Sequence, residues 1–149
     1  MIVSKVEDKY YSDCVELINK FYKEALNEYS SQDIKKTEIE LAFNKYRDTS
    51  YLLVNDKDAA IGVIAGQELP WILTGEKVFQ EVMWYLDEDY RRYGVYFLKH
   101  VERLLIEDNY KMLVMVCLHN SKTEKLFNFY NRVGFKAMET HFIKTLGAN

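Results

Sequence analysis

The chain has 149 residues, the length of one domain, and its 48% hydrophobic and 29% charged residues suit a protein that buries a core. The 20 basic and 23 acidic residues give a net charge of −3 without a basic cluster, which argues against nucleic acid or an anionic membrane as a partner. No long apolar segment follows the N-terminus, and the two cysteines suggest no disulfide framework. We therefore predict a single cytoplasmic domain over residues 1–149.

The first half of the chain alternates strand and helix patterns. Residues 2–6 alternate apolar with polar side chains and predict a short strand. Helical spacing follows from Asp13 and again from about Asp33, with a polar break at residues 27–32. Two strand-like runs, residues 50–55 and 59–66, then predict a hairpin, in which Gly62 and Gly66 indicate a bulge or a close backbone approach.

The central stretch, residues 79–109, predicts a strand, a short acidic turn and an amphipathic helix. A strand that ends where a turn containing Gly94 opens a helix leaves backbone N–H groups without intrahelical partners, which suits a phosphate or pyrophosphate. Asn109 tolerates a left-handed conformation and predicts the helix end. A strand at residues 111–118 follows, so a single crossover helix joins two strands that we expect to be parallel and to splay apart.

The C-terminal part predicts one more helix and two strands. Ser121 and Glu124 match a reciprocal capping pattern at the helix start, and Gly134 suits a left-handed cap at its end. Residues 135–138 and 141–146 then predict the last two strands. The order β-α-α-β-β-β-α-β-α-β-β predicts an α/β (α+β) fold, with a mixed seven-stranded sheet and helices on both faces.

Two local motifs lie on these elements. Residues 91–96, Arg-Arg-Tyr-Gly-Val-Tyr, follow the pattern Arg/Gln-x-x-Gly-x-Gly/Ala at the start of the third helix, except at the last position. Residues 130–135 match Tyr-x-x-x-Gly-Phe at the end of the fourth helix. With the element order, these motifs resemble the GNAT family of N-acetyltransferases over nearly the whole chain. The general texture is most similar to the short acetyltransferase-like proteins of tailed phages.

This resemblance implies an acetyl-CoA-dependent N-acetyltransferase acting on an amine of a small molecule or a protein. Acetyl-CoA would be the acyl donor, and no metal is implied; a homodimer is left open. The implied cofactor-binding residues are those of the strand that pairs with the pantetheine arm and those of the pyrophosphate loop: Trp84, Tyr85, Leu86, Arg91, Arg92, Tyr93, Gly94, Val95 and Tyr96.

The resemblance also implies two catalytic groups. Tyr130 would protonate the departing thiolate, although a tyrosine here could equally be a core ring. A general base would lie on the fourth strand, where Gln80 stands about where some members carry a glutamate. We name its neighbour Glu81 as the base, on the condition that a bulge turns its side chain into the cleft.

Tyr96 departs from the motif, which has Gly or Ala at this position. Its phenol could obstruct the pyrophosphate, turn aside and stack on the cofactor, or mark a chain that no longer binds it. The alternative function is therefore a catalytically silent GNAT-fold binding or inhibitor protein. A flavodoxin-like or dinucleotide-binding fold would need a glycine-rich loop after the first strand and mostly parallel strands, and neither is present.

Overall fold

The computed structural model describes residues 1–27, 33–120 and 122–147. The chain forms two compact units, Met1–Val116 and Cys117–Asn149, and each is described by itself. Residues 28–32 of the predicted polar break, and the predicted capping residue Ser121, lie outside the described residues.

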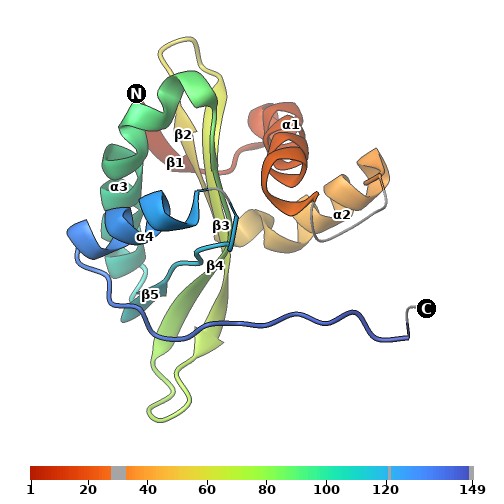
Figure 1. Ribbon diagram of the computed structural model, residues 1–149. Helices are drawn as coiled ribbons and strands as arrows, with labels where there is room; N and C mark the ends of the chain where they lie inside the picture. The colour runs from red at the N-terminus through yellow and green to blue at the C-terminus, as the bar shows by residue number, and fades with distance from the viewer. Residues whose placement is uncertain (28–32, 121, 148–149) are drawn as a thin grey trace. The chain divides into compact units, whose positions relative to one another are not determined.

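Five strands form one sheet in the first unit, in the spatial order β1-β2-β3-β4-β5 (Figure 1). They are β1 (Ile2–Lys5), β2 (Ser50–Val54), β3 (Ala60–Pro70), β4 (Lys77–Leu86) and β5 (Met112–Val114). Strands β1 to β4 pair antiparallel with one another in that order. Strand β5 pairs with the other edge of β4 and runs parallel to it. The predicted mixed sheet and its parallel pair are therefore confirmed.

The number of predicted strands is wrong. The described sheet has five strands and not seven, because residues 135–145 adopt no regular secondary structure. Apolar side chains in this stretch are open to solvent, and Phe142 is 94% exposed. A strand exists only through hydrogen bonds to a neighbour, so β-prone composition is not sufficient where the backbone makes no ladder.

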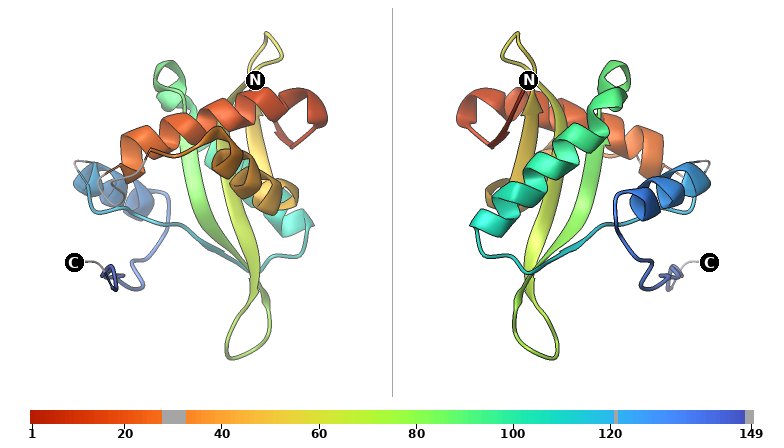
Figure 2. Two further views of the ribbon diagram at one scale, coloured as in Figure 1. Left: turned by 90° about the vertical axis from the view of Figure 1, so that its right-hand side faces the viewer. Right: turned by 90° about the vertical axis from the view of Figure 1, so that its left-hand side faces the viewer.

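Helices cover both faces of the sheet in the first unit (Figures 1 and 2). The helical elements of the chain are a 3₁₀ turn (Asp8–Tyr10), α1 (Tyr11–Phe21), a π-helical turn (Tyr22–Leu26), α2 (Lys36–Tyr46), a 3₁₀ turn (Arg47–Thr49), a 3₁₀ helix (Glu88–Tyr93), α3 (Gly94–Glu107) and α4 (Thr123–Arg132). Helices α1 and α2 lie against one face of the sheet, and α3 crosses the other. The core between α1, α2 and the sheet includes Cys14, Leu17, Phe43, Leu52, Val63 and Met83.

Both helix ends that the sequence predicted are confirmed. Asn109 has a φ of 65° just after α3, and Gly134 has a φ of 99° just after α4. In each case the N–H of the next residue donates a hydrogen bond of 3.0 Å to the carbonyl five residues earlier. This bond satisfies a carbonyl that the end of the helix would otherwise leave without a partner.

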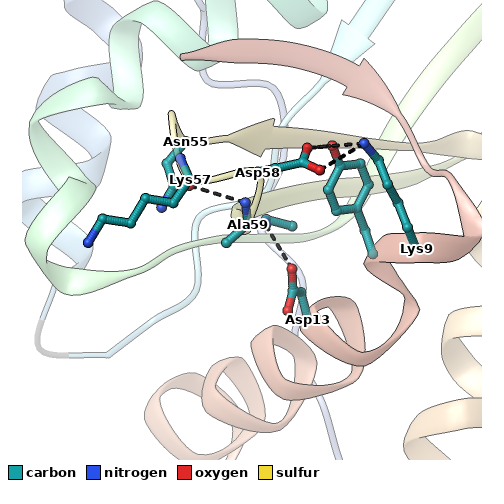
Figure 3. Close-up of polar contacts among 8 residues, drawn as sticks. Lys9, Asp13, Asn55, Lys57, Asp58 and Ala59 are labelled. Carbon is teal, nitrogen blue, oxygen red and sulfur yellow. Dashed lines mark hydrogen bonds and ion pairs between the residues drawn. The ribbon is translucent and has the colours of Figure 1, made fainter.

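The start of α1 is tied to the turn between β2 and β3 (Figure 3). The Asp58 carboxylate accepts hydrogen bonds from Lys9 Nζ at 3.0 Å and from the Tyr10 hydroxyl at 2.5 Å. Asp13 of α1 accepts a third, from the Ala60 N–H at 2.9 Å. Hydrogen bonds that involve a charged group are stronger than those between neutral groups. These three bonds therefore attach the start of α1 to the turn between β2 and β3.

A β-bulge interrupts the pairing of β3 with β4. Ala65 pairs with Met83 and Gly66 with Glu81, so Val82 is the extra residue. A Cβ added at Gly66 would overlap the Phe79 ring and lie 2.6 Å from the Gln80 carbonyl oxygen. Glycine is therefore required beside the bulge because backbone and ring occupy the space of a side chain, as the sequence predicted.

We expect Gly66→Ala to lower the free energy of unfolding by about 1–3 kcal/mol, since the added methyl overpacks a site walled by backbone. Urea denaturation measures this loss. Gly94→Ala is the matched control, because a Cβ there lies 3.8 Å from its nearest contact and φ is −55°. The control should be neutral or stabilising by up to about 1 kcal/mol. Equal stability of wild type and Gly66→Ala would contradict the close approach.

Candidate functional site

The site is built around the Glu81 carboxylate. Val82 and Met83 both pack on the core below α1 and α2, so the bulge turns Glu81 to the opposite face, which it shares with Phe79. This is the shift on which the predicted role of Glu81 depended. Its side chain is only 5% exposed.

The carboxylate lies where β4 and β5 part. The parallel ladder ends at Gln80 and Val114, and two residues later the Val116 N–H donates to Glu81 Oε2 at 2.8 Å. The side chain of Glu81 thus contacts the chain just beyond the end of the ladder. In the described part of the chain, no strand pairs with the remainder of β4 on this side.

Burial makes Glu81 the one carboxyl of the site that can hold a proton near neutral pH. Desolvation raises its pKa from the ordinary 4.5 to about 7, although the hydrogen bond from Val116 partly opposes the rise. A buried acid with a pKa close to neutrality is suited to accept a proton during a reaction and release it afterwards.

The predicted pyrophosphate segment is more closed than expected. Residues 88–93 coil as a 3₁₀ helix that runs directly into α3, and the Gly94 N–H donates to the Arg91 carbonyl. Tyr90 N–H likewise donates to the Asp87 carbonyl at 2.9 Å. Some of the donors expected to be open are therefore used within the segment. The sequence motif did not indicate these internal hydrogen bonds, because it left open which conformation Gly94 adopts. Gly94 has an ordinary helical φ and does not interrupt the coil.

Several predicted cofactor-binding residues do come together. Trp84 Cζ2 is the nearest atom to the position of a Cβ on Gly94, at 3.8 Å, so the end of β4 and the start of α3 adjoin. The Nε atom of Arg91 lies 3.5 Å from the Leu86 carbonyl oxygen. Arg92 stacks its guanidinium over the Tyr93 ring at 5.0 Å. Tyr85 points to the other face, where it packs against the core below α1 and α2.

Tyr96 lies at the side of α3. Its hydroxyl donates to the Met1 carbonyl at 3.3 Å, and its ring packs on His100 with centroids 4.0 Å apart. Val95 beside it is partly exposed. The phenol is thus held by contacts to Met1 and His100, and the three alternatives for its effect on the cofactor stay predictions.

Arg91 has a carboxylate partner that sequence analysis did not find. Its Nη2 lies 2.6 and 2.8 Å from the two carboxylate oxygens of Glu24, in the π-helical turn after α1. One helical turn earlier, Lys20 pairs with Asp87 at 2.8 Å. The partners in each pair are 67 residues apart, and the only trace in the sequence is the matching four-residue spacing within each segment.

A cavity of about 310 Å³ lies between α1, α2 and the sheet. Its walls are almost entirely apolar and aromatic, formed by Ile18, Phe21, Tyr22, Leu26, Ile34, Ala42, Phe43, Tyr46, Ser50, Val63, Ala65, Val82 and Met83. The Ser50 hydroxyl is already bonded to the Tyr46 carbonyl at 2.7 Å. None of these described lining residues is charged, and they include Val82, the residue next to Glu81.

Tyr130 belongs to the second unit. It is buried near the end of α4, where its ring packs on Phe129 and Phe135 with centroids 5.8 and 5.4 Å apart. The match to Tyr-x-x-x-Gly-Phe therefore has a local structural basis, because the Gly134 turn brings Phe135 back onto the tyrosine ring.

The described residues also bear on whether the site holds a metal and whether the chain spans a membrane. Among the described residues, no group of three His, Cys, Asp or Glu side chains is arranged to hold a metal ion. None of the described helices combines the length and apolar character needed to span a bilayer.

Solved structures with the same fold include several that are described as acetyltransferases. A ribosomal-protein-alanine N-acetyltransferase from Brucella melitensis superposes with a TM-score of 0.72 at 11% identity, covering 98% of this chain and 100% of that one. An aminoglycoside 6′-N-acetyltransferase from Acinetobacter haemolyticus gives 0.70 at 13% identity, with 100% of both chains covered. An acetyltransferase from Trypanosoma brucei gives 0.67 at 16%, covering 97% and 99%.

At these identities the structures establish the fold alone. No curated protein sequence matches the chain as a relative. The sequence profile of the Acetyltransferase (GNAT) family, however, matches residues 11–135, which is most of the chain and includes residues of both compact units. The protein therefore belongs to the GNAT acetyltransferase family.

Proposed function

We propose that the protein is an acetyl-CoA-dependent N-acetyltransferase that uses Glu81 as general base. The observation that carries this proposal is the buried Glu81 carboxylate, placed by a bulge at the divergence of β4 and β5 and given a pKa of about 7. A base must lie near the reacting amine and titrate near the working pH, and Glu81 has the second property in a member of this family.

The part of β4 beyond the parallel ladder supports the proposed cofactor site, because no described strand pairs with this edge. An extended pantetheine arm carries amide groups that can pair with the backbone of residues 82–86, as an added strand would. Gly94 adjoins this edge without a side chain, and Arg91 supplies a cation at the following turn. Acetyl-CoA binding at the N–H groups of residues 92–96 requires the 3₁₀ coil of residues 88–93 to loosen, since the Gly94 N–H is bonded within it.

The chemistry then needs three things from the chain. Glu81 takes a proton from the amine, whose nitrogen attacks the thioester carbonyl carbon and forms the new amide. Backbone donors stabilise the oxyanion. Tyr130 gives its hydroxyl proton to the departing thiolate and regains one from solvent, since a phenol with a pKa of about 10 is protonated at neutral pH.

The apolar cavity indicates the acceptor. A polycationic acceptor would need carboxylates along its site, whereas none of the described residues that line this cavity is charged. We therefore propose an amine attached to an aromatic or aliphatic group that would fill the cavity. Because Glu81 lies on the opposite face of β4, the amine would have to reach its carboxylate where β4 and β5 part.

A catalytically silent binding protein remains the second candidate, because one observation favours it. The segment that should receive the pyrophosphate is coiled on its own hydrogen bonds, and Arg91 in it is paired with Glu24. If the segment never opens, the fold serves another purpose.

The first prediction from this proposed function concerns the cofactor. Acetyl-CoA should bind the wild-type protein in isothermal calorimetry, and Gly94→Val should weaken this binding at least about tenfold. A β-branched side chain at the helix start would both block approach of the phosphates and resist local rearrangement. Gly94→Ala, which adds a Cβ without a clash, controls for folding and should lose less. Absence of binding by the wild type, with binding restored in Tyr96→Gly, would instead support the silent protein.

The second prediction concerns the proton taken up by Glu81. With acetyl-CoA and 2-phenylethylamine, Glu81→Gln should slow CoA release by about 10²-fold at pH 8, the usual contribution of a general base. The ratio of wild-type to Glu81→Gln rates, which cancels ionisation of the amine, should rise with pH and level off above about 7, because only the deprotonated carboxylate accepts a proton. A ratio that stays flat from pH 5 to 9 would contradict the assignment.

The third prediction concerns Tyr130. Tyr130→Phe should keep the acetyl-CoA affinity and slow turnover by about 10²-fold if the hydroxyl protonates the thiolate. A tyrosine that only packs against Phe129 and Phe135 would keep its rate after this change, because phenylalanine preserves the ring. Equal rates of CoA release would end the catalytic assignment.

A further inference from the structure

Two ion pairs join the end of α1 to the segment that precedes α3. Lys20 pairs with Asp87 at 2.8 Å, and Glu24 lies against Arg91 at 2.6 and 2.8 Å. Each segment contributes one cation and one anion four residues apart, so two successive turns face each other with opposite charges. The second pair involves the arginine of the pyrophosphate motif.

A cation at the start of a helix is electrostatically unfavourable unless an anion lies beside it, because the helix dipole is positive there. Glu24 supplies that anion for Arg91. The pair can exchange with solvent, since the two side chains remain 39% and 33% exposed. Exposed ion pairs contribute little to stability, so a more highly charged anion can displace the carboxylate.

We propose that Glu24 competes with the cofactor for Arg91, and that displacement of its carboxylate by the pyrophosphate of acetyl-CoA releases the π-helical turn that follows α1. This inference rests on the proposed function, because it takes Arg91 to be part of the pyrophosphate site. It assigns Glu24 a role in setting cofactor affinity that no sequence motif indicates.

The release has a consequence for the acceptor cavity. Tyr22 and Leu26 lie on either side of Glu24 in the same π-helical turn, and both line the cavity. A turn that is tied to Arg91 before the cofactor binds and freed afterwards couples the two sites through one short segment. Glu24 is therefore a positioning residue, since it acts on the reaction through Arg91 and the cavity wall.

The test measures the affinities of inorganic pyrophosphate and of acetyl-CoA, by calorimetry, for wild type, Glu24→Gln and Glu16→Gln. Glu24→Gln should bind both ligands about two- to fivefold more tightly, the factor that corresponds to an exposed ion pair. Glu16→Gln is the matched control. It removes the same charge from the neighbouring helix α1, but Glu16 pairs with Lys20, at 3.6 Å, and not with Arg91. Its affinities should equal those of the wild type.

The outcomes separate this inference from the function on which it rests. Unchanged or weaker binding by Glu24→Gln, while the wild type binds acetyl-CoA, would overturn the competition and leave the proposed function standing. Equal gains in both variants would show a general effect of charge and also overturn it. If none of the three proteins binds either ligand, the cofactor site itself is wrong. Thermal unfolding of the variants checks that each is folded.

Discussion

The candidate site depends on one extra residue in β4. Because Val82 is accommodated as a bulge opposite Ala65 and Gly66, the strand changes phase, and Glu81 leaves the face that Met83 occupies. The bulge is possible only because Gly66 has no side chain where the Phe79 ring and the Gln80 carbonyl lie. Without the bulge, the carboxylate would face the hydrophobic core below α1 and α2.

The same carboxylate lies at the end of the parallel ladder. The Val116 N–H donates to Glu81 two residues beyond the last pair, Gln80 and Val114. Burial of a carboxyl is costly when the group is charged, and this cost is what raises its pKa toward neutrality. The acid with the raised pKa thus lies where the ladder between the two strands ends.

The face of the sheet below α1 and α2 carries the apolar cavity, whose wall includes Val82, the residue next to Glu81. The position of α1 over this face depends on polar contacts at its two ends. The end of α1 is held to the turn before α3 by Lys20 and Glu24, while its start is held by Asp58 and Asp13. Helix α1 is therefore anchored at both ends by polar contacts. The exposed pair of Glu24 with Arg91 is the contact that we propose an anionic ligand displaces.

Features that depend on a few neighbouring residues could be predicted from the sequence. The ends of α3 and α4 follow from the ability of Asn109 and Gly134 to adopt a positive φ, and the helical faces follow from apolar spacing. The two motifs, with the element order, were sufficient for the family. Even the need for a bulge near Glu81 could be stated as a condition, because the two-residue period of a strand decides which side chains share a face.

The tertiary structure alone decided the features that join distant segments. The strands expected in residues 135–146 did not form, since β-propensity provides no hydrogen-bonding partner. The coil before α3 used donors that the motif suggested were open, and Arg91 found its carboxylate 67 residues away at Glu24. The pKa of Glu81 likewise depends on burial by the whole fold. Local conformation is encoded within a few residues, whereas pairing, burial and charge partners depend on which parts of the chain meet in space.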